Sequence, residues 1–224
     1  QSIIPILIER GFQVFALARS TTSAEIVKDL GAIPVIDDLT SLSRNTADAL
    51  RACEYVLHSA AHMDLSYDKA LFYKINVQAT EDLLRKSIEN GIRRFVFISA
   101  APVVPGSPIV NLTEKDAGKQ FPKALYPKTK AIAEKAVLKA NSKSFKTISL
   151  RPPAIWGPNN HHYDDLLENV KNGKWRWIGG GHQILSTIHV KNLASAVLAA
   201  LSSDEGGQAR SEEHTSELQS RETI

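Results

Sequence analysis

Two kinds of apolar pattern alternate along the first two thirds of the chain. Short apolar runs that are typical of buried strands lie at Phe12–Ala18, Ala32–Asp38, Glu54–His58, Arg94–Ser99 and Phe145–Leu150. Segments whose apolar residues recur at helical spacing lie at Gln1–Gly11, Ala24–Gly31, Leu42–Cys53, Tyr67–Asn90 and Pro127–Ala140. The alternation predicts an α/β fold over residues 1–150, with a doubly wound, Rossmann-like parallel sheet between layers of helices.

The pattern changes at the two ends of this region. Strand candidates at Trp175–Gly181 and Ser186–Val190 and a helical pattern at Asn192–Leu201 predict a partial substrate-binding lobe over residues 151–209. Residues 210–224 begin RSEEHTSELQS, which reads as the translation of a common sequencing-adapter read, so we expect a non-native tail there. A natural disordered tail is the alternative. The first helix has no strand before it, so we expect the first strand of the sheet to be missing.

Composition and charge exclude several classes of function. The chain has 43% hydrophobic and 23% charged residues and a formal net charge of +3, without a basic run, so no nucleic-acid partner is expected. No apolar stretch is long enough to cross a bilayer, and no signal peptide is visible, so a cytoplasmic location is expected. Cys53 is the single cysteine and fits a helical core position. The adjacent pair His161-His162 lacks a third ligand, so no metal site is expected.

The segment Tyr126-Pro127-Lys128-Thr129-Lys130 carries candidate acid/base chemistry. Pro127 suits the first position of a helix, which places Tyr126 at the helix entrance. Tyr126 and Lys130 are four residues apart and therefore share one helix face. A phenol has a pKa of about 10, and a neighbouring ammonium would lower it toward neutrality. The spacing thus predicts a tuned proton donor and acceptor.

The YPKTK segment is one of six sequence stretches that follow one another along the chain. They are VLHSAAH (56–62), KINVQAT (74–80), RRFVFISA (93–100), YPKTK (126–130), LRPPAIWGP (150–158) and STIHVKNLA (186–194). Together they resemble the extended short-chain dehydrogenase/reductase family along nearly all of Gln1 to about Ser203. The nearest branch holds 3β-hydroxysteroid dehydrogenase-like and NAD-dependent epimerase/dehydratase proteins. The resemblance implies an NAD(P)-dependent oxidoreductase that transfers hydride at a CH–OH group. A nucleotide-sugar epimerase/dehydratase and a non-catalytic NAD(P)-binding sensor are the alternatives.

The resemblance also implies partners and residue roles. The substrate is a small molecule, whether sterol-like, a sugar nucleotide or another alcohol or carbonyl compound, and a homodimer is left open. Tyr126 would be the general acid/base, and Lys130 would lower its pKa and bind the nicotinamide ribose. The other implied positions are Ser59, Ala60 and Ala61 at the ribose and phosphates, Asp38 and Leu39 at the adenine, Pro152 and Pro153 at the carboxamide, and Asn76 as a structural contact.

Three features of the sequence either depart from the family pattern or bear on the choice of cofactor. The glycine-rich phosphate loop G-x-x-G-x-x-G is absent from the sequence. The family's catalytic hydroxyl residue falls on Ala100, so either Ser99 takes that role as a third catalytic residue or the hydroxyl is missing. Arg19 and Ser20 end a predicted strand where an arginine accommodates a 2′-phosphate, which favours NADP, with NAD as the alternative. A surface arginine is the plainer interpretation of Arg19.

Overall fold

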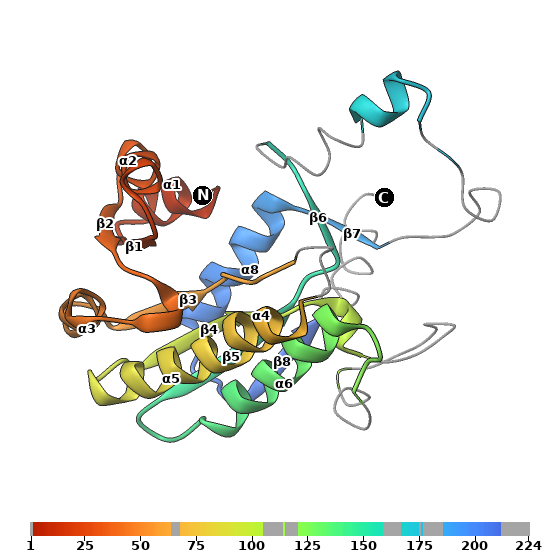
Figure 1. The fold of residues 1–224 in the computed structure, drawn as a ribbon. Coiled ribbons are helices and arrows are strands. Elements are labelled where there is room, and N and C mark those ends of the chain that lie inside the picture. The colour runs from red at the N-terminus through yellow and green to blue at the C-terminus, as the bar shows by residue number, and fades with distance from the viewer. Residues whose placement is uncertain are drawn as a thin grey trace, which may run out of the picture.

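A computed structural model of the chain describes residues 2–63, 68–104, 114, 121–158, 167–174, 176 and 186–211. Helices and strands alternate in it, as the pattern predicts (Figure 1). The strands are β1 (Phe15–Ala18), β2 (Ile33–Ile36), β3 (Tyr55–His58), β4 (Arg94–Ile98), β5 (Lys146–Arg151), β6 (Ala154–Trp156), β7 (Thr187–His189) and β8 (Gln208–Ser211). The helices are α1 (Ile3–Glu9), α2 (Thr21–Asp29), α3 (Arg44–Arg51), α4 (Lys69–Tyr73), α5 (Ala79–Glu89), α6 (Leu125–Lys139) and α8 (Val190–Ser202).

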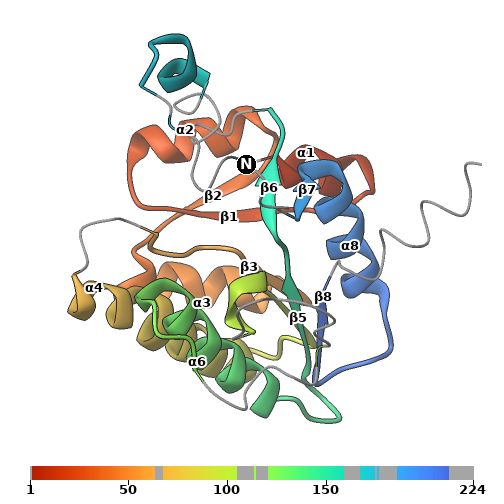
Figure 2. The same ribbon diagram turned by 90° about the vertical axis from the view of Figure 1, so that its right-hand side faces the viewer.

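All strand pairs among the described residues are parallel, which confirms the predicted α/β class. A four-stranded sheet has the order β3-β4-β5-β8, and β1 and β2 form a separate pair. Within the described part of the chain, β1 and β3 are not hydrogen-bonded to each other, and the β1–β2 pair with α1 and α2 forms its own layer (Figures 1 and 2). Side chains from α1, β3, β4 and α8 share one core cluster, which joins this layer to the larger sheet.

The two faces of β4 bury different helices. Phe95 and Phe97 are fully buried in a cluster with residues of α5 and α6. Val96, between them, points to the other side and packs with residues of α1, β5 and α8. The period of two therefore places α6 and α8 on opposite faces of the sheet (Figure 1).

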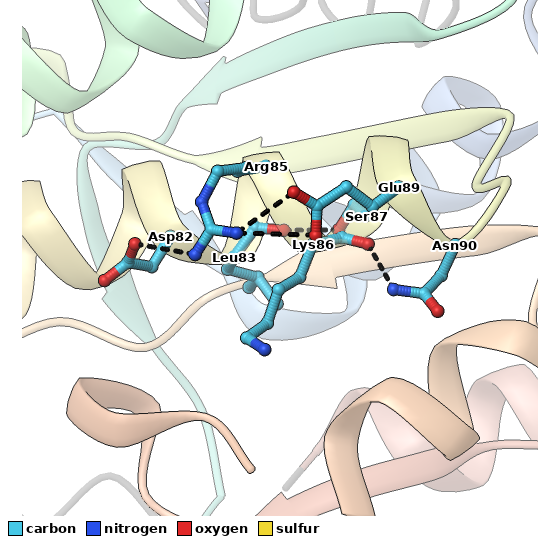
Figure 3. A network of polar contacts seen from close by, with 7 residues as sticks. All are labelled: Asp82, Leu83, Arg85, Lys86, Ser87, Glu89 and Asn90. Carbon is cyan, nitrogen blue, oxygen red and sulfur yellow. Dashed lines mark hydrogen bonds and ion pairs between the residues drawn. The ribbon is translucent and has the colours of Figure 1, made fainter. Parts of the chain in front are cut away.

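The predicted long helix before Gly91 is interrupted in its middle. A π-helical turn over Lys74–Gln78 separates α4 from α5. Such turns place one extra residue in a helix and are frequent at functional sites. On the exposed side of α5, Arg85 donates to Asp82 (3.3 Å) and Glu89 (3.0 Å) (Figure 3). The buried Ser87 donates to the Leu83 carbonyl, and Asn90, just after the helix, donates to the Lys86 carbonyl. The exposed Arg85 pairs contribute little stability, so burial of the opposite face holds this helix.

Residues after the predicted boundary at 151 also contribute to the main sheet. Helix α8 lays Ala194, Val197, Ala200 and Leu201 against the sheet, and β8 pairs with β5, so Arg210 and Ser211 lie within a strand. The reason is physical: the apolar face of α8 requires burial, and a βαβ crossover onto the sheet provides it. Residues 212–224, Trp175, Trp177 and the pair His161-His162 lie outside the described residues, and the expected origin of the tail stays a prediction.

The described helices include none that combines the length and the apolar character of a membrane span.

Candidate active site

The predicted site residues follow the carboxyl ends of successive strands. Arg19 follows β1, Asp38 follows β2, Ser59 follows β3, Ser99 follows β4 and Pro152 follows β5. In an open parallel α/β sheet, ligands bind outside this edge of the strands. Ser59, Ser99 and Pro152 therefore lie at one edge of the β3-β4-β5-β8 sheet, whereas Arg19 and Asp38 follow the separate β1–β2 pair.

Helix α6 carries the acid/base pair. It begins at Leu125, so Tyr126 and Lys130 lie on its first turns. The ammonium of Lys130 donates to the Ile98 carbonyl at 2.6 Å and lies 4.0 Å from the centroid of the Phe97 ring. The side chain is almost entirely buried, and this burial lowers the pKa of Lys130 to about 7, with a partly offsetting rise from the nearby Glu134 carboxylate.

Burial acts on Tyr126 in the opposite sense to the sequence expectation. It raises the pKa of the phenol above its ordinary value, because a buried phenolate loses solvation. The phenol is therefore protonated near neutral pH, which suits a proton donor. The lowering expected from a cationic nicotinamide would act against this burial effect.

Beside Lys130, His58 forms a buried hydrogen-bond chain to the π-helical turn. Its Nε2 lies 2.8 Å from Thr80 Oγ1, and that hydroxyl donates to the Asn76 carbonyl at 2.9 Å. A threonine hydroxyl has one proton, so His58 Nε2–H must be the donor to Thr80. Burial, together with the charge of Lys130, lowers the pKa of His58 to about 3, so the imidazole is neutral.

Asn76 ties three segments together. Its Oδ1 accepts from the His62 amide at 2.7 Å, and its Nδ2 donates to the His62 carbonyl at 3.1 Å. The same Nδ2 donates to Thr129 Oγ1 at 3.0 Å, on the residue next to Lys130. Asn76 thus fixes the segment after β3, which holds Ser59, Ala60 and Ala61, relative to the start of α6.

The end of β4 does not offer an open hydroxyl. The Ser99 amide donates to the Leu150 carbonyl at 2.7 Å, so the ladder continues through Ser99 and its side chain shares the face of Phe97. Its Oγ is shut off from solvent and finds no hydrogen-bond partner within the described residues. Ala100, at the position of the family's hydroxyl, is also buried, at 7% exposure.

The residues expected near the adenosine part of the cofactor differ in exposure and in hydrogen bonding. Arg19 is exposed, and Ser20 caps α2 by accepting from the Ser23 amide at 3.2 Å. The Asp38 carboxylate accepts from the amide and the hydroxyl of Thr40, and these bonds, with smaller effects of the Arg19 and Lys74 charges, lower its pKa.

The remaining predicted positions are placed as follows. The Leu39 side chain packs into the core cluster that contains residues of α5. Ser59 and Ala60 are exposed and Ala61 is half-buried in the segment after β3. Pro152 is buried, with its carbonyl accepting from the Ala101 amide at 2.9 Å, and Pro153 is half-buried.

A buried ion pair one helical turn from Lys130 was not predicted from the sequence. Glu134 and Arg151 pair at 2.7 Å, with side chains only 6% and 3% exposed, and Ser149 donates to the same carboxylate at 2.8 Å. The available signal was the run Tyr126, Lys130 and Glu134 at intervals of four on one helix. Among the described residues, no group of three or more His, Cys, Asp or Glu side chains could hold a metal ion.

Comparisons with known proteins cover nearly the whole chain. Residues 1–213 match the 3-beta hydroxysteroid dehydrogenase/isomerase family. The chain is 32% identical over 210 residues to 4-hydroxy-2-methyl-3-oxo-4-farnesyl-3,4-dihydroquinoline-1-oxide ketoreductase of Stigmatella aurantiaca, covering 93% of this chain and 63% of that one. It is 33% identical over 207 residues to the decarboxylating sterol-4-alpha-carboxylate 3-dehydrogenase of Dictyostelium discoideum, covering 89% of this chain and 63% of that one.

Solved structures agree on the fold. UDP-glucose 4-epimerase of Thermus thermophilus, solved in complex with NAD, superimposes with a TM-score of 0.79 at 21% identity, over 93% of this chain and 72% of that one. At this identity the likeness concerns the fold alone. The relatives are longer, since this chain spans 63% of the length of the two proteins named above. The chain belongs to the 3-beta hydroxysteroid dehydrogenase/isomerase family, within the extended short-chain dehydrogenases/reductases.

Proposed function

We propose that the protein is an NADP-preferring oxidoreductase that reduces a ketone or oxidises a secondary alcohol of an apolar small molecule. The observation that carries the proposal is the pair on α6: the half-buried Tyr126 and the buried Lys130 lie one helical turn apart, and the Lys130 ammonium is anchored to the Ile98 carbonyl. This pair stands at the carboxyl edge of the sheet, where such folds bind dinucleotides.

The chain supplies the proton chemistry and the positioning. When bound, the nicotinamide cofactor provides or accepts the hydride. Tyr126 donates a proton to the substrate oxygen during reduction and removes it during oxidation. Lys130 has three N–H donors and uses one on Ile98, so the others are available for the hydroxyls of a ribose. Its positive charge also stabilises the phenolate left on Tyr126 after proton donation.

Exposed charge at the end of β1 supports the choice of cofactor. Arg19 is solvent-exposed at the position where an arginine meets a 2′-phosphate, and its charge reaches Asp38 at the end of β2. Lys74, on the π-helical turn, adds a second positive charge near Asp38. Two cations at this edge favour the phosphorylated cofactor over NAD.

The relatives guide the choice of substrate class. One carries the name of a ketoreductase and the other that of a sterol 3-dehydrogenase, so we infer a carbonyl or hydroxyl group on an apolar ring system. The epimerase/dehydratase and the cofactor sensor remain the rival functions, and the buried Ala100 gives the sensor its support.

Cofactor turnover tests the proposal and separates it from its rivals. The full-length protein is mixed with NADPH and a panel of cyclic apolar ketones, and with UDP-sugars in a parallel set. We expect stoichiometric loss of NADPH absorbance with the ketones. Product from the sugar nucleotides without net loss of NADPH would instead show an epimerase or dehydratase. Tight NADPH binding without any product would show a sensor.

A further inference from the structure

The ion pair of Glu134 and Arg151 lies on the side of Lys130 that faces away from Tyr126 along α6. Helix geometry puts Tyr126, Lys130 and Glu134 on one face at successive turns. The carboxylate is held from three directions: Arg151 Nε at 3.0 Å, Arg151 Nη2 at 2.7 Å and Ser149 Oγ at 2.8 Å. These hydrogen bonds fix the position of the carboxylate.

Among the residues that the structure describes, the other groups around Lys130 carry no negative charge. From β3 it faces His58, which is neutral, and from β4 it faces the Phe97 ring and the Ile98 carbonyl. From β5 comes Arg151, a second cation that is neutralised by its pair with Glu134. Within the described residues, Glu134 is thus the acidic group whose charge acts on Lys130.

A buried ammonium needs an anion or strong dipoles to keep its proton. Removing a lysine from water disfavours its charged form, and burial alone brings Lys130 into the range where it loses its proton near neutral pH. An anion one helical turn away opposes that loss. The Ile98 carbonyl and the Phe97 ring contribute as dipole and quadrupole.

We propose that Glu134 is a positioning residue for Lys130, whose carboxylate, clamped by Arg151 and Ser149, keeps the buried ammonium protonated. The inference rests on the proposed function, because a protonated Lys130 matters only where it serves Tyr126 and the cofactor ribose. Arg151 then acts by fixing the carboxylate.

A purely structural pair makes a different prediction. Buried ion pairs are often replaceable by apolar residues with little loss of stability, whereas removal of one partner leaves a costly unpaired charge. Glu134→Gln leaves Arg151 unpaired and tests both roles at once. The double substitution Glu134→Met with Arg151→Met removes both charges, keeps the volume and isolates the effect on Lys130.

The experiment measures the titration of Lys130 directly. Full-length protein is labelled with [ε-¹³C]lysine, the Lys130 resonance is assigned through Lys130→Arg, and its chemical shift is followed from pH 5 to 11. We expect the midpoint to fall by about one pH unit in Glu134→Gln, because the anion is lost and Arg151 is left as an unpaired cation. In the double variant the midpoint should still fall, but less, because the Arg151 cation is lost together with the anion. Glu89→Gln, on the exposed side of α5, is the matched control and should leave the midpoint unchanged.

Catalysis provides the second readout. In the reduction direction the alkaline limb of kcat/KM should move to lower pH by the same amount as the Lys130 midpoint. An unchanged midpoint in a folded double variant overturns the proposal, and so does a shifted midpoint with an unmoved alkaline limb. A wild-type protein that turns over no substrate defeats the proposed function, while the midpoint still reports whether Glu134 holds the proton on Lys130.

Discussion

The side-chain amide of Asn76 donates to the hydroxyl of Thr129 at 3.0 Å, which joins the π-helical turn to the first turns of α6. The same asparagine makes two bonds to the backbone of His62. One buried side chain therefore sets the distance between the segment after β3 and the residue beside Lys130.

Asn76→Ala should lower the free energy of unfolding by about 2 to 4 kcal/mol, because it leaves the partly buried amide and carbonyl of His62 and the Asn76 site itself without these bonds. It should also weaken NADPH binding, since the segment holding Ser59 loses its anchor. Urea unfolding and a fluorescence titration measure the two effects. Thr129→Val removes one of the three bonds and should cost only about 1 kcal/mol. Equal costs for the two substitutions would contradict this account of Asn76.

His58 should make stability fall as the solution is acidified. Burial lowers the pKa of His58 from 6.5 to about 3 in the folded chain. Below pH 6.5 the imidazole is therefore protonated in the unfolded state and still neutral in the folded state. The stability contributed by neutral His58 is complete above pH 6.5 and is lost progressively as the pH falls toward 3.

Between pH 6.5 and 5 this single group should cost about 1 to 2 kcal/mol. Urea unfolding of the wild type and of His58→Gln at both pH values isolates the cost, since glutamine keeps a donor for Thr80 but does not titrate in this range. A pH dependence that is the same in both proteins would show that His58 is not the titrating group.

The end of β4 should gain activity from a restored hydroxyl. Ser99 Oγ is closed off from solvent, and Ala100 occupies the position of the family's hydroxyl. Ala100→Ser should raise kcat by about tenfold, a fraction of the hundredfold or more that an oxyanion donor is worth. Ser99→Ala should change kcat less than about threefold by the same reasoning. A large fall in kcat in Ser99→Ala, with no rise in kcat in Ala100→Ser, would show that Ser99 is the catalytic hydroxyl residue.

Arg19→Asp should change the choice of cofactor. The substitution replaces a partner of the 2′-phosphate by a repelling charge, so NADPH affinity should fall by at least tenfold while NADH affinity changes little. The ratio of the two dissociation constants is the measurement. Arg10→Asp, on an exposed residue just after α1, is the matched control for charge. An unchanged ratio in Arg19→Asp would remove this residue from the site.

The sequence predicted the elements that depend on local periodicity and missed features that depend on tertiary packing. Alternating strand and helix patterns located β1 to β5 and α6 to within a few residues. Strand β8 could not be found in this way, because its polar residues QARS carry no apolar period and join the sheet through α8.

The candidate site also combines features that are visible in the sequence with features that depend on tertiary packing. Tyr126 and Lys130 were visible as a spacing on one helix, but the role of Glu134 depends on Arg151, which lies 17 residues away on β5. Burial raises the pKa of Tyr126 in the chain by itself, which the four-residue spacing did not predict. Burial is set by the fold and cannot be derived from a four-residue spacing.

The central claim is that Tyr126 transfers the proton that accompanies hydride transfer. Single-turnover oxidation of NADPH by Tyr126→Phe, with a ketone that the wild type reduces, tests it most directly, alongside the NADPH dissociation constant of both proteins. Removal of the phenol hydroxyl should slow this step by about a hundredfold to ten-thousandfold, the worth of a positioned general acid, and leave the dissociation constant within about twofold. A Tyr126→Phe protein that oxidises NADPH at the wild-type rate would contradict the account.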